Sequence, residues 1–266
     1  MKIIVCVKQV PDTSGKVAVN ANGTLDRASM QTITNPDDLN AVEAALALKD
    51  QTGAEVIVVT MGPPPAEGML RELLAMGADR GVLVSGREFG GSDTYATSQI
   101  LAAAVNKIGV DAEDIVLCGR QAIDGDTAQV GPQIAEKLDL PQVTYVAGIE
   151  KDGNALTVKR ALEDGYMTIK VQTPCMLTCI KELNEPRYMN VADIYGCYDK
   201  PVDVFDFNTL KDEPLIDVNK IGLKGSPTNI LISFTPPQKG AGQMLEGCGK
   251  ETTDKLAGIL AEKHVI

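Results

Sequence analysis

Two aspartates and an arginine stand close together in residues 119–132, a stretch dense in groups that could bind a ligand. Arg120 follows a glycine, and Asp124 and Asp126 flank Gly125. Both carboxylates would repel a phosphate placed beside them, so they suit the hydroxyls of a ribose or ribityl chain, or the capping of a helix. Backbone N–H groups at the start of a following helix could instead bind a phosphate or a carbonyl. The residues leave both interpretations of the aspartates open.

A buried strand and a helix must position these groups. Residues 115–118 form an apolar run with β-branched side chains, typical of a strand buried on both faces, and the run ends at Gly119. Apolar residues then recur at helical spacing over 130–138, which predicts a helix with Asp126 or Thr127 as its N-cap. Ligands of open parallel sheets lie beyond the carboxyl ends of the strands, so the loop between strand and helix is the predicted binding site.

Three further strands alternate with helices before this stretch, which predicts an α/β fold with a parallel, Rossmann-like sheet and helices on both faces. The expected strands are 1–8, 55–60 and 81–84, and the expected helices are one opened by 35–38 and stopped by Gly53, one through 69–76 and one through 100–108. A hairpin or loop is expected at 20–24. The loops that follow the strands would meet at one edge as a rim that can hold a long nucleotide; they cover 9–11, 60–62, 90–97 and 120–130.

The character of the chain changes after Pro141. Residues 142–146, 155–160 and 166–171 have the pattern of antiparallel strands, which would extend one edge of the sheet. Beyond residue 198 the sequence is irregular until a short amphipathic helix at 254–262. We therefore expect a nucleotide-binding domain over 1–197 and a C-terminal arm over 198–266. The arm would lie on a partner subunit, or pack loosely on its own domain.

Charge and composition exclude several classes of function. The formal net charge is −11, which argues against nucleic acid or an anionic membrane surface as the main partner, because both require clustered Lys and Arg. No apolar run approaches the ~20 residues that a membrane span needs. Residues 1–8 lack the longer apolar region of a signal peptide. We expect a cytoplasmic protein without membrane insertion.

Catalytic side chains and metal ligands are scarce. The only histidine, His264, lies close to the end of the chain. Cys6 and Cys118 lie in apolar strands and are interpreted as core residues, and Cys175 and Cys179 lack the further ligands of a zinc or iron–sulfur site. We expect free thiols, no metal site and no catalytic residue in this chain.

Four motifs occur in order along the chain and together resemble the electron transfer flavoprotein beta (small) subunit. A later Gly225–Thr228 stretch fits the same resemblance, while residues 164–167 depart from the Gly-Gly-x-Glu pattern that is more common in the family. The motifs are Cys6–Asp12 (CVKQVPD), Asn35–Asp38 (NPDD), Gly119–Pro132 (GRQAIDGDTAQVGP) and Leu183–Tyr188 (LNEPRY).

This resemblance implies an adenine nucleotide alpha hydrolase-like fold with an extended C-terminal arm, in a heterodimer with an electron transfer flavoprotein alpha subunit. One subclass of the family holds structural AMP in the beta subunit. In the other, FAD at this site exchanges electrons with NAD(H) in flavin-based electron bifurcation or confurcation, with an acyl-CoA or hydroxy-acid dehydrogenase and with ferredoxin or flavodoxin. The 119–132 motif is similar to the bifurcating type, which we favour.

Two alternatives remain beside these subclasses. A stand-alone adenine-nucleotide-binding module would need neither partner nor redox role. An adenylating enzyme is disfavoured because residues 89–94, which superficially resemble its phosphate loop, follow the third strand rather than the first. The resemblance also marks residues 181–198 as a recognition loop for partner dehydrogenases, and the alternative is an ordinary surface loop capped by Pro186.

Matching the family's motifs residue by residue implies a set of cofactor-binding residues in this chain. Asp124 would meet a sugar or ribityl hydroxyl, the backbone of 127–130 would meet phosphate, and Thr94 and Thr97 could bond to an isoalloxazine edge. The implied residues are Val7, Asn35, Asp37, Thr60, Met61, Thr94, Thr97, Arg120, Gln121, Ala122, Asp124, Asp126, Thr127, Ala128, Gln129 and Val130.

Overall fold

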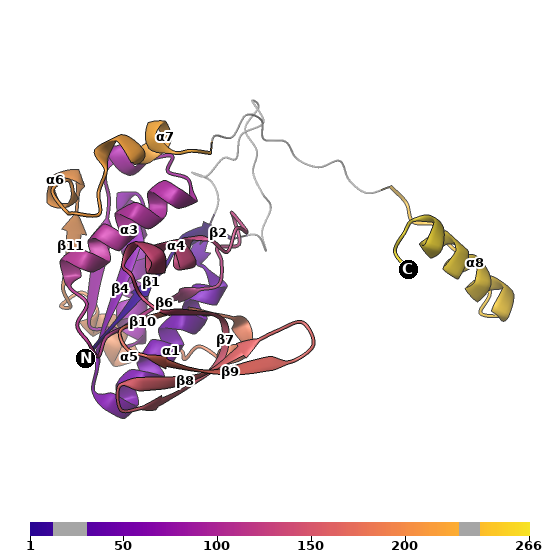
Figure 1. The fold of residues 1–266 in the computed structure, drawn as a ribbon, viewed down its shortest axis with the longest axis horizontal. Helices are drawn as coiled ribbons and strands as arrows, with labels where there is room; N and C mark the ends of the chain where they lie inside the picture. Colours follow the sequence, from indigo (N-terminus) through magenta and orange to yellow (C-terminus); the bar gives the residue numbers. More distant parts are fainter. Residues whose placement is uncertain (13–30, 229–239) are drawn as a thin grey trace.

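Nine strands form one sheet in the computed structural model, which describes residues 1–12, 31–228 and 240–266 (Figure 1). Neighbouring strands run parallel from β11 to β7, and β7, β8 and β9 are antiparallel. The order across the sheet is β11 (Val202–Phe205), β5 (Arg80–Val84), β4 (Glu55–Met61), β1 (Lys2–Cys6), β6 (Ile115–Gly119), β10 (Cys175–Cys179), β7 (Gln142–Asp152), β8 (Ala155–Ala161) and β9 (Tyr166–Gln172). A separate antiparallel pair joins β2 (Gln9–Pro11) to β3 (Thr32–Thr34).

Helices cover both faces of the sheet, because the strand side chains alternate between two cores. Ile3 and Val5 of β1 face the core that holds α1 and α2. Ile4 faces the core that holds α3 and α4. The helices are α1 (Pro36–Thr52), α2 (Glu67–Met76), α3 (Thr94–Ile108), α4 (Val130–Lys137), α5 (Val191–Gly196), α6 (Phe207–Leu210), α7 (Gly222–Gly225) and α8 (Lys250–Glu262), and the 3₁₀ turns are η1 (Pro64–Ala66), η2 (Arg87–Phe89), η3 (Lys181–Leu183) and η4 (Val218–Lys220). The predicted fold class is confirmed.

The strand order reverses at β1. The chain passes from β1 to β4 and β5 on one side, and then returns to β6 on the other side of β1. In open parallel sheets such a switch point opens a crevice at the carboxyl ends of the two strands, which is where ligands bind. The predicted loop after Gly119 therefore lies at the switch point.

Three expectations about local structure need correction. β10 lies between β6 and β7 and was not predicted, because its five residues are all buried and carry no periodicity that separates strand from helix. β11 shows that residues 202–205 are not irregular; they pair with β5. α4 begins at Val130 with Gln129 at its N-cap, so neither Asp126 nor Thr127 caps it.

The expected hairpin or loop at residues 20–24 lies outside the described residues. The predicted terminal helix is present as α8, which begins earlier than expected and has no buried residue. Figure 1 draws α8 well apart from the sheet. No helix in the described ranges combines the length and apolar character needed to cross a membrane.

Candidate functional site

The loops at the carboxyl ends of β1, β4, β5 and β6, together with the starts of α1 and α3, form one edge of the sheet. We call this edge the rim; its residues are 7–9, 34–38, 60–62, 85–97 and 119–130. All sixteen residues implied by the family motifs fall on the rim, because parallel strands bring their carboxyl ends to the same edge.

Asp38 ties three elements of the rim together. It is 6% exposed, and its carboxylate accepts the N–H of Gly119 at 2.8 Å and the N–H of Lys8 at 2.9 Å. Burial raises the pKa of Asp38 to about 7, against the lowering effect of these hydrogen bonds. The ends of β1 and β6 are thereby fixed to the first turn of α1.

Asn35 fixes the loop that follows β6. Its side chain is fully buried; it donates to the carbonyl of Gln121 at 2.8 Å and accepts the N–H of Ile123 at 3.0 Å. Because both polar groups of the amide are occupied by this loop, Asn35 acts here as a positioning residue rather than as a free donor to a ligand.

Asp37 and Arg120 meet at the rim without forming a hydrogen bond. Asp37 Oδ2 and Arg120 Nε are 3.4 Å apart, and both atoms are buried and lack a hydrogen-bond partner within the described part of the chain. Burial raises the pKa of Asp37, while Arg120 lowers it. Buried polar groups are normally hydrogen-bonded, so this ion pair is an unusual feature of the rim.

The two aspartates of the loop have partners other than a helix terminus. Asp124 forms an ion pair with Lys8, with Oδ1 and Nζ 2.7 Å apart. Asp126 accepts a hydrogen bond from the side chain of Gln121. Asp126 and Ala128 have φ values of +54° and +53°, which no helix accommodates. The capping interpretation of the aspartates is therefore wrong.

α3 brings the third loop to the rim. Its N-cap Asp93 accepts the N–H of Ala96 at 3.0 Å and that of Thr228 at 2.9 Å, and these bonds lower the pKa of Asp93. The Gly225–Thr228 stretch is thus attached to the rim. Thr94 Oγ1 lies 3.2 Å from Gln129 Oε1, so the loops after β5 and β6 touch.

The structure brings several implied residues into direct contact. These contacts are Asn35 with Gln121, Asp37 with Arg120, Thr94 with Gln129, and Gln121 with Asp126. The sequence reasoning missed Lys8 and Asp38 as rim residues, and it missed Tyr145 of β7, whose ring contacts Arg120 of the rim. Lys8 and Asp38 belong to the CVKQVPD and NPDD motifs, which could have identified them, whereas none of the four motifs contains Tyr145.

The chemistry of the rim fits a ligand that carries phosphate and sugar groups. Thr60 is 1% exposed, and its Oγ1 has no partner among the described residues. This hydroxyl, the Arg120 guanidinium and the Asp37 carboxylate are donors and acceptors of the kinds that bind phosphate and sugar groups. Gly125 faces open space where a Cβ would stand, so a ligand can approach the backbone closely.

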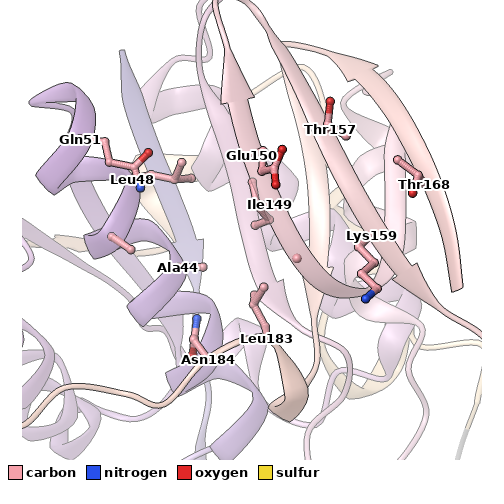
Figure 2. A pocket seen from close by; sticks show the side chains of 12 residues that line it. Ala44, Leu48, Gln51, Ile149, Glu150, Thr157, Lys159, Thr168, Leu183 and Asn184 are labelled. Carbon is pink, nitrogen blue, oxygen red and sulfur yellow. The ribbon is translucent and has the colours of Figure 1, made fainter.

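A hollow lies away from the rim, between α1 and the antiparallel strands β7, β8 and β9 (Figure 2). Its volume is about 520 Å³, and Leu48, Ile149 and Leu183 line it beside the charged Glu150 and Lys159. None of the sixteen implied residues lines it. We place the candidate site at the rim, because three buried polar atoms without a hydrogen-bond partner in the described ranges, on Asp37, Thr60 and Arg120, lie there.

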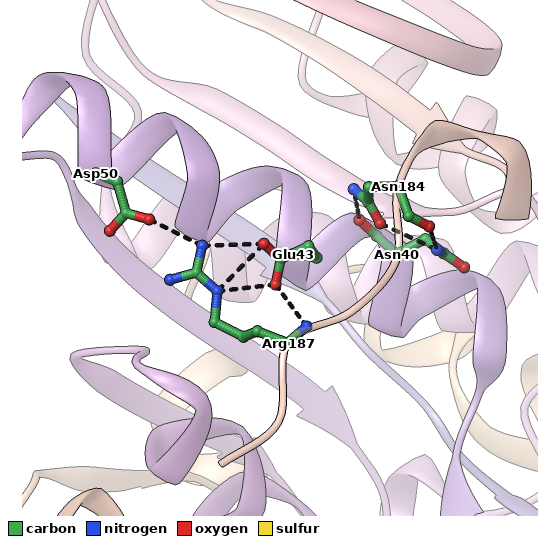
Figure 3. A network of polar contacts seen from close by, with 5 residues as sticks. All are labelled: Asn40, Glu43, Asp50, Asn184 and Arg187. Carbon is green, nitrogen blue, oxygen red and sulfur yellow. Dashed lines mark hydrogen bonds and ion pairs between the residues drawn. The ribbon is translucent and has the colours of Figure 1, made fainter. Parts of the chain in front are cut away.

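The predicted recognition loop is held on α1 by a polar network (Figure 3). Arg187 donates to Glu43 at 2.9 Å and to Asp50 at 2.8 Å, and these bonds raise the pKa of Arg187. Asn40 and Asn184 hydrogen-bond to each other. The segment that follows exposes large apolar side chains, namely Tyr188, Met189, Val191, Ile194, Tyr195 and Tyr198.

Four of the cysteines behave as core residues. Cys6, Cys118, Cys175 and Cys179 are buried and free, and burial raises the pKa of the Cys6 and Cys175 thiols to about 12. They are therefore poor nucleophiles. Within residues 1–12, 31–228 and 240–266, no cluster of His, Cys, Asp and Glu could hold a metal ion.

Comparison with known proteins assigns the chain to a family. The model of the electron transfer flavoprotein domain matches residues 22–209. The chain is 66% identical to the acryloyl-CoA reductase electron transfer subunit gamma of Anaerotignum propionicum and 51% identical to the caffeyl-CoA reductase-Etf complex subunit CarD of Acetobacterium woodii. It is 50% identical to the electron transfer flavoprotein subunit beta of Clostridium acetobutylicum. All three alignments cover 100% of both chains.

Proposed function

The chain belongs to the electron transfer flavoprotein family as a beta subunit, and from this premise we propose that its rim binds FAD that exchanges electrons with NAD(H) in electron bifurcation or confurcation. The observation that carries the proposal is the full-length identity of 66% and 51% to electron transfer subunits named for an acryloyl-CoA reductase and a caffeyl-CoA reductase-Etf complex. The sequence of the loop after β6 favours the same subclass. Structural AMP at this site is the alternative.

Each part of the rim would then have a role in holding the dinucleotide. We assign Asp124 to a sugar or ribityl hydroxyl, and the backbone of 127–130 at the start of α4 to phosphate. Arg120 would stabilise negative charge, and Thr94 and Thr97 would bond to the polar edge of the ring. When bound, the flavin supplies the redox chemistry, and the protein contributes binding, orientation and electrostatics.

Counting flavins tests the proposal directly. We expect the purified heterodimer with its alpha subunit to contain two FAD per dimer, and one of them to be reduced by NADH. One FAD together with one AMP per dimer would contradict the proposal and establish the alternative subclass. Denaturing release of the nucleotides, followed by chromatographic separation, distinguishes the two results.

We assign the partner contacts to the arm and to the recognition loop. Residues 198–266 would contact the alpha subunit, with β11 anchoring the arm to β5 and the fully unburied α8 seated on the partner. The exposed aromatic residues after Arg187 would contact an acyl-CoA or hydroxy-acid dehydrogenase. Ferredoxin or flavodoxin would be the second acceptor, and a cytoplasmic location remains part of this proposal.

Loss of the Arg187 clamp should weaken dehydrogenase binding. Arg187→Met keeps the length of the side chain but removes its bonds to Glu43 and Asp50 (Figure 3). Because the side chain is 35% exposed, we expect a loss of about 1 kcal/mol, or roughly fivefold in Kd. A titration of dehydrogenase with heterodimer measures this change.

A matched control comes from Arg80, which pairs with Asp203 at the β11 edge of the sheet with the charged atoms 2.6 Å apart. Arg80→Met should leave dehydrogenase binding unchanged. Equal weakening by both substitutions would show that loss of an arginine, rather than release of the recognition loop, causes the effect.

A further inference from the structure

Tyr145 has a backbone conformation that side chains of its size rarely adopt. Its φ is +56° although it lies inside β7, and strand residues normally have φ near −120° to −140°. The other described non-glycine residues with positive φ are Asp126, Ala128, Asp139 and His264, and all of them lie outside strands. Such strain persists only where the surrounding structure imposes it, often at functional sites.

A β-bulge imposes this conformation. Between Val143 and Val146, two residues of β7 face one residue of β10, Thr178. Thr178 is 2% exposed, and its Oγ1 accepts the N–H of Tyr145 at 3.3 Å. Bulges bend a strand and redirect a side chain. A glycine would adopt this backbone conformation without strain. The conformation of the backbone therefore gives no reason for a tyrosine at position 145.

The redirected ring lies against Arg120. The central carbon of the guanidinium is 5.9 Å from the centroid of the Tyr145 ring, within the range of a cation–π contact. Arg120 is also held by its backbone N–H, which donates to the carbonyl of Cys179 at 2.7 Å. Asp37 lies 3.4 Å from its Nε. The ring and the carboxylate therefore fix a guanidinium that is 35% exposed at the rim.

The geometry points to Tyr145 as a positioning residue of the nucleotide site. Its ring holds the guanidinium of Arg120 in place to meet an anionic oxygen of the bound adenine nucleotide. This inference rests on the proposed nucleotide site at the rim. The aromatic face supplies the contact, so the hydroxyl of Tyr145 is not required, and phenylalanine can replace it.

Nucleotide titrations of the full heterodimer test this role. Wild type, Tyr145→Phe, Tyr145→Leu, Arg120→Gln and the double variant Tyr145→Leu/Arg120→Gln are stripped of the beta-site nucleotide and titrated with FAD and with AMP. We expect the Phe variant to bind like wild type and the Leu variant to bind at least one nucleotide roughly two- to fivefold more weakly. In the Arg120→Gln background, the Leu substitution should cause no further loss.

Tyr145→Gly separates this role from a contribution to folding. Because glycine relieves the positive φ, we expect an unfolding midpoint at or above that of wild type, together with the same weaker binding as the Leu variant. Wild-type affinity for both nucleotides in the Leu variant overturns the inference. An equal loss from Tyr145→Leu in both backgrounds overturns it as well. If instead the proposed function is wrong, the unmodified heterodimer contains no second FAD. That result is distinct from any change in affinity among the variants.

Discussion

Gly119→Ala is expected to destabilise the rim by roughly 3 kcal/mol, the upper end of the usual cost of overpacking. A Cβ at this position would lie 2.5 Å from Asp38 Oδ1, 2.6 Å from the carbonyl carbon of Asp37 and 2.7 Å from the backbone nitrogen of Asp38. Two of these atoms belong to the backbone at the start of α1 and cannot rotate away. The clash would push β6 from α1 and strain the hydrogen bond between Gly119 and Asp38. Urea unfolding of the heterodimer at fixed concentration measures the loss.

Gly125→Ala provides the control within the same loop. A Cβ at Gly125 meets no atom within 4 Å, so this substitution should change the free energy of unfolding by less than about 0.5 kcal/mol. If the two variants unfold at the same urea concentration, close packing of Gly119 against α1 does not contribute to stability as we argue.

The strand and helix alternation of the first 140 residues was predictable, because each element there has a local pattern. Buried parallel strands show in the sequence as short runs of apolar residues. α1 ends before Gly53, which has a φ of +70°, as expected for a helix C-cap. The position of β10 between β6 and β7 was not predictable. Strand order is a tertiary property, and the sequence of β10 is compatible with either neighbour.

The candidate site was predictable as a set of loops but not as a set of contacts. Parallel topology alone places the carboxyl ends of β1, β4, β5 and β6 at one edge. The partners of Asp124 and Asp126 depend on how the loop folds, and the positive φ of Asp126 and Ala128 contradicts the helix start that the apolar spacing suggested. Tyr145 was missed because its positive φ is a conformation that tyrosine rarely adopts, and local sequence patterns do not predict it.

Asp38 should make the protein less stable as the pH rises. An aspartate whose pKa is lowered by folding has the opposite effect. Its pKa is about 7 in the folded chain, against an ordinary value of 3.8, because burial disfavours the charged form. The folded state therefore binds the proton more tightly than the unfolded state. The resulting stabilisation is complete below the ordinary pKa and is lost as the pH rises toward 7, by about 1.4 kcal/mol per pH unit.

Asp38→Asn isolates this contribution, because an amide stays neutral at every pH and keeps one oxygen that can accept the N–H of Gly119 or of Lys8. Neighbouring groups such as Asp37 titrate in both proteins, so their effects cancel in the comparison. Between about pH 5 and about pH 8, the advantage of wild type over the variant should shrink by roughly 3 kcal/mol. Urea unfolding of both heterodimers at the two pH values measures it. A difference that stays constant or grows with pH would show that Asp38 is ionised throughout, and that hydrogen bonds to Gly119 and Lys8 outweigh its burial.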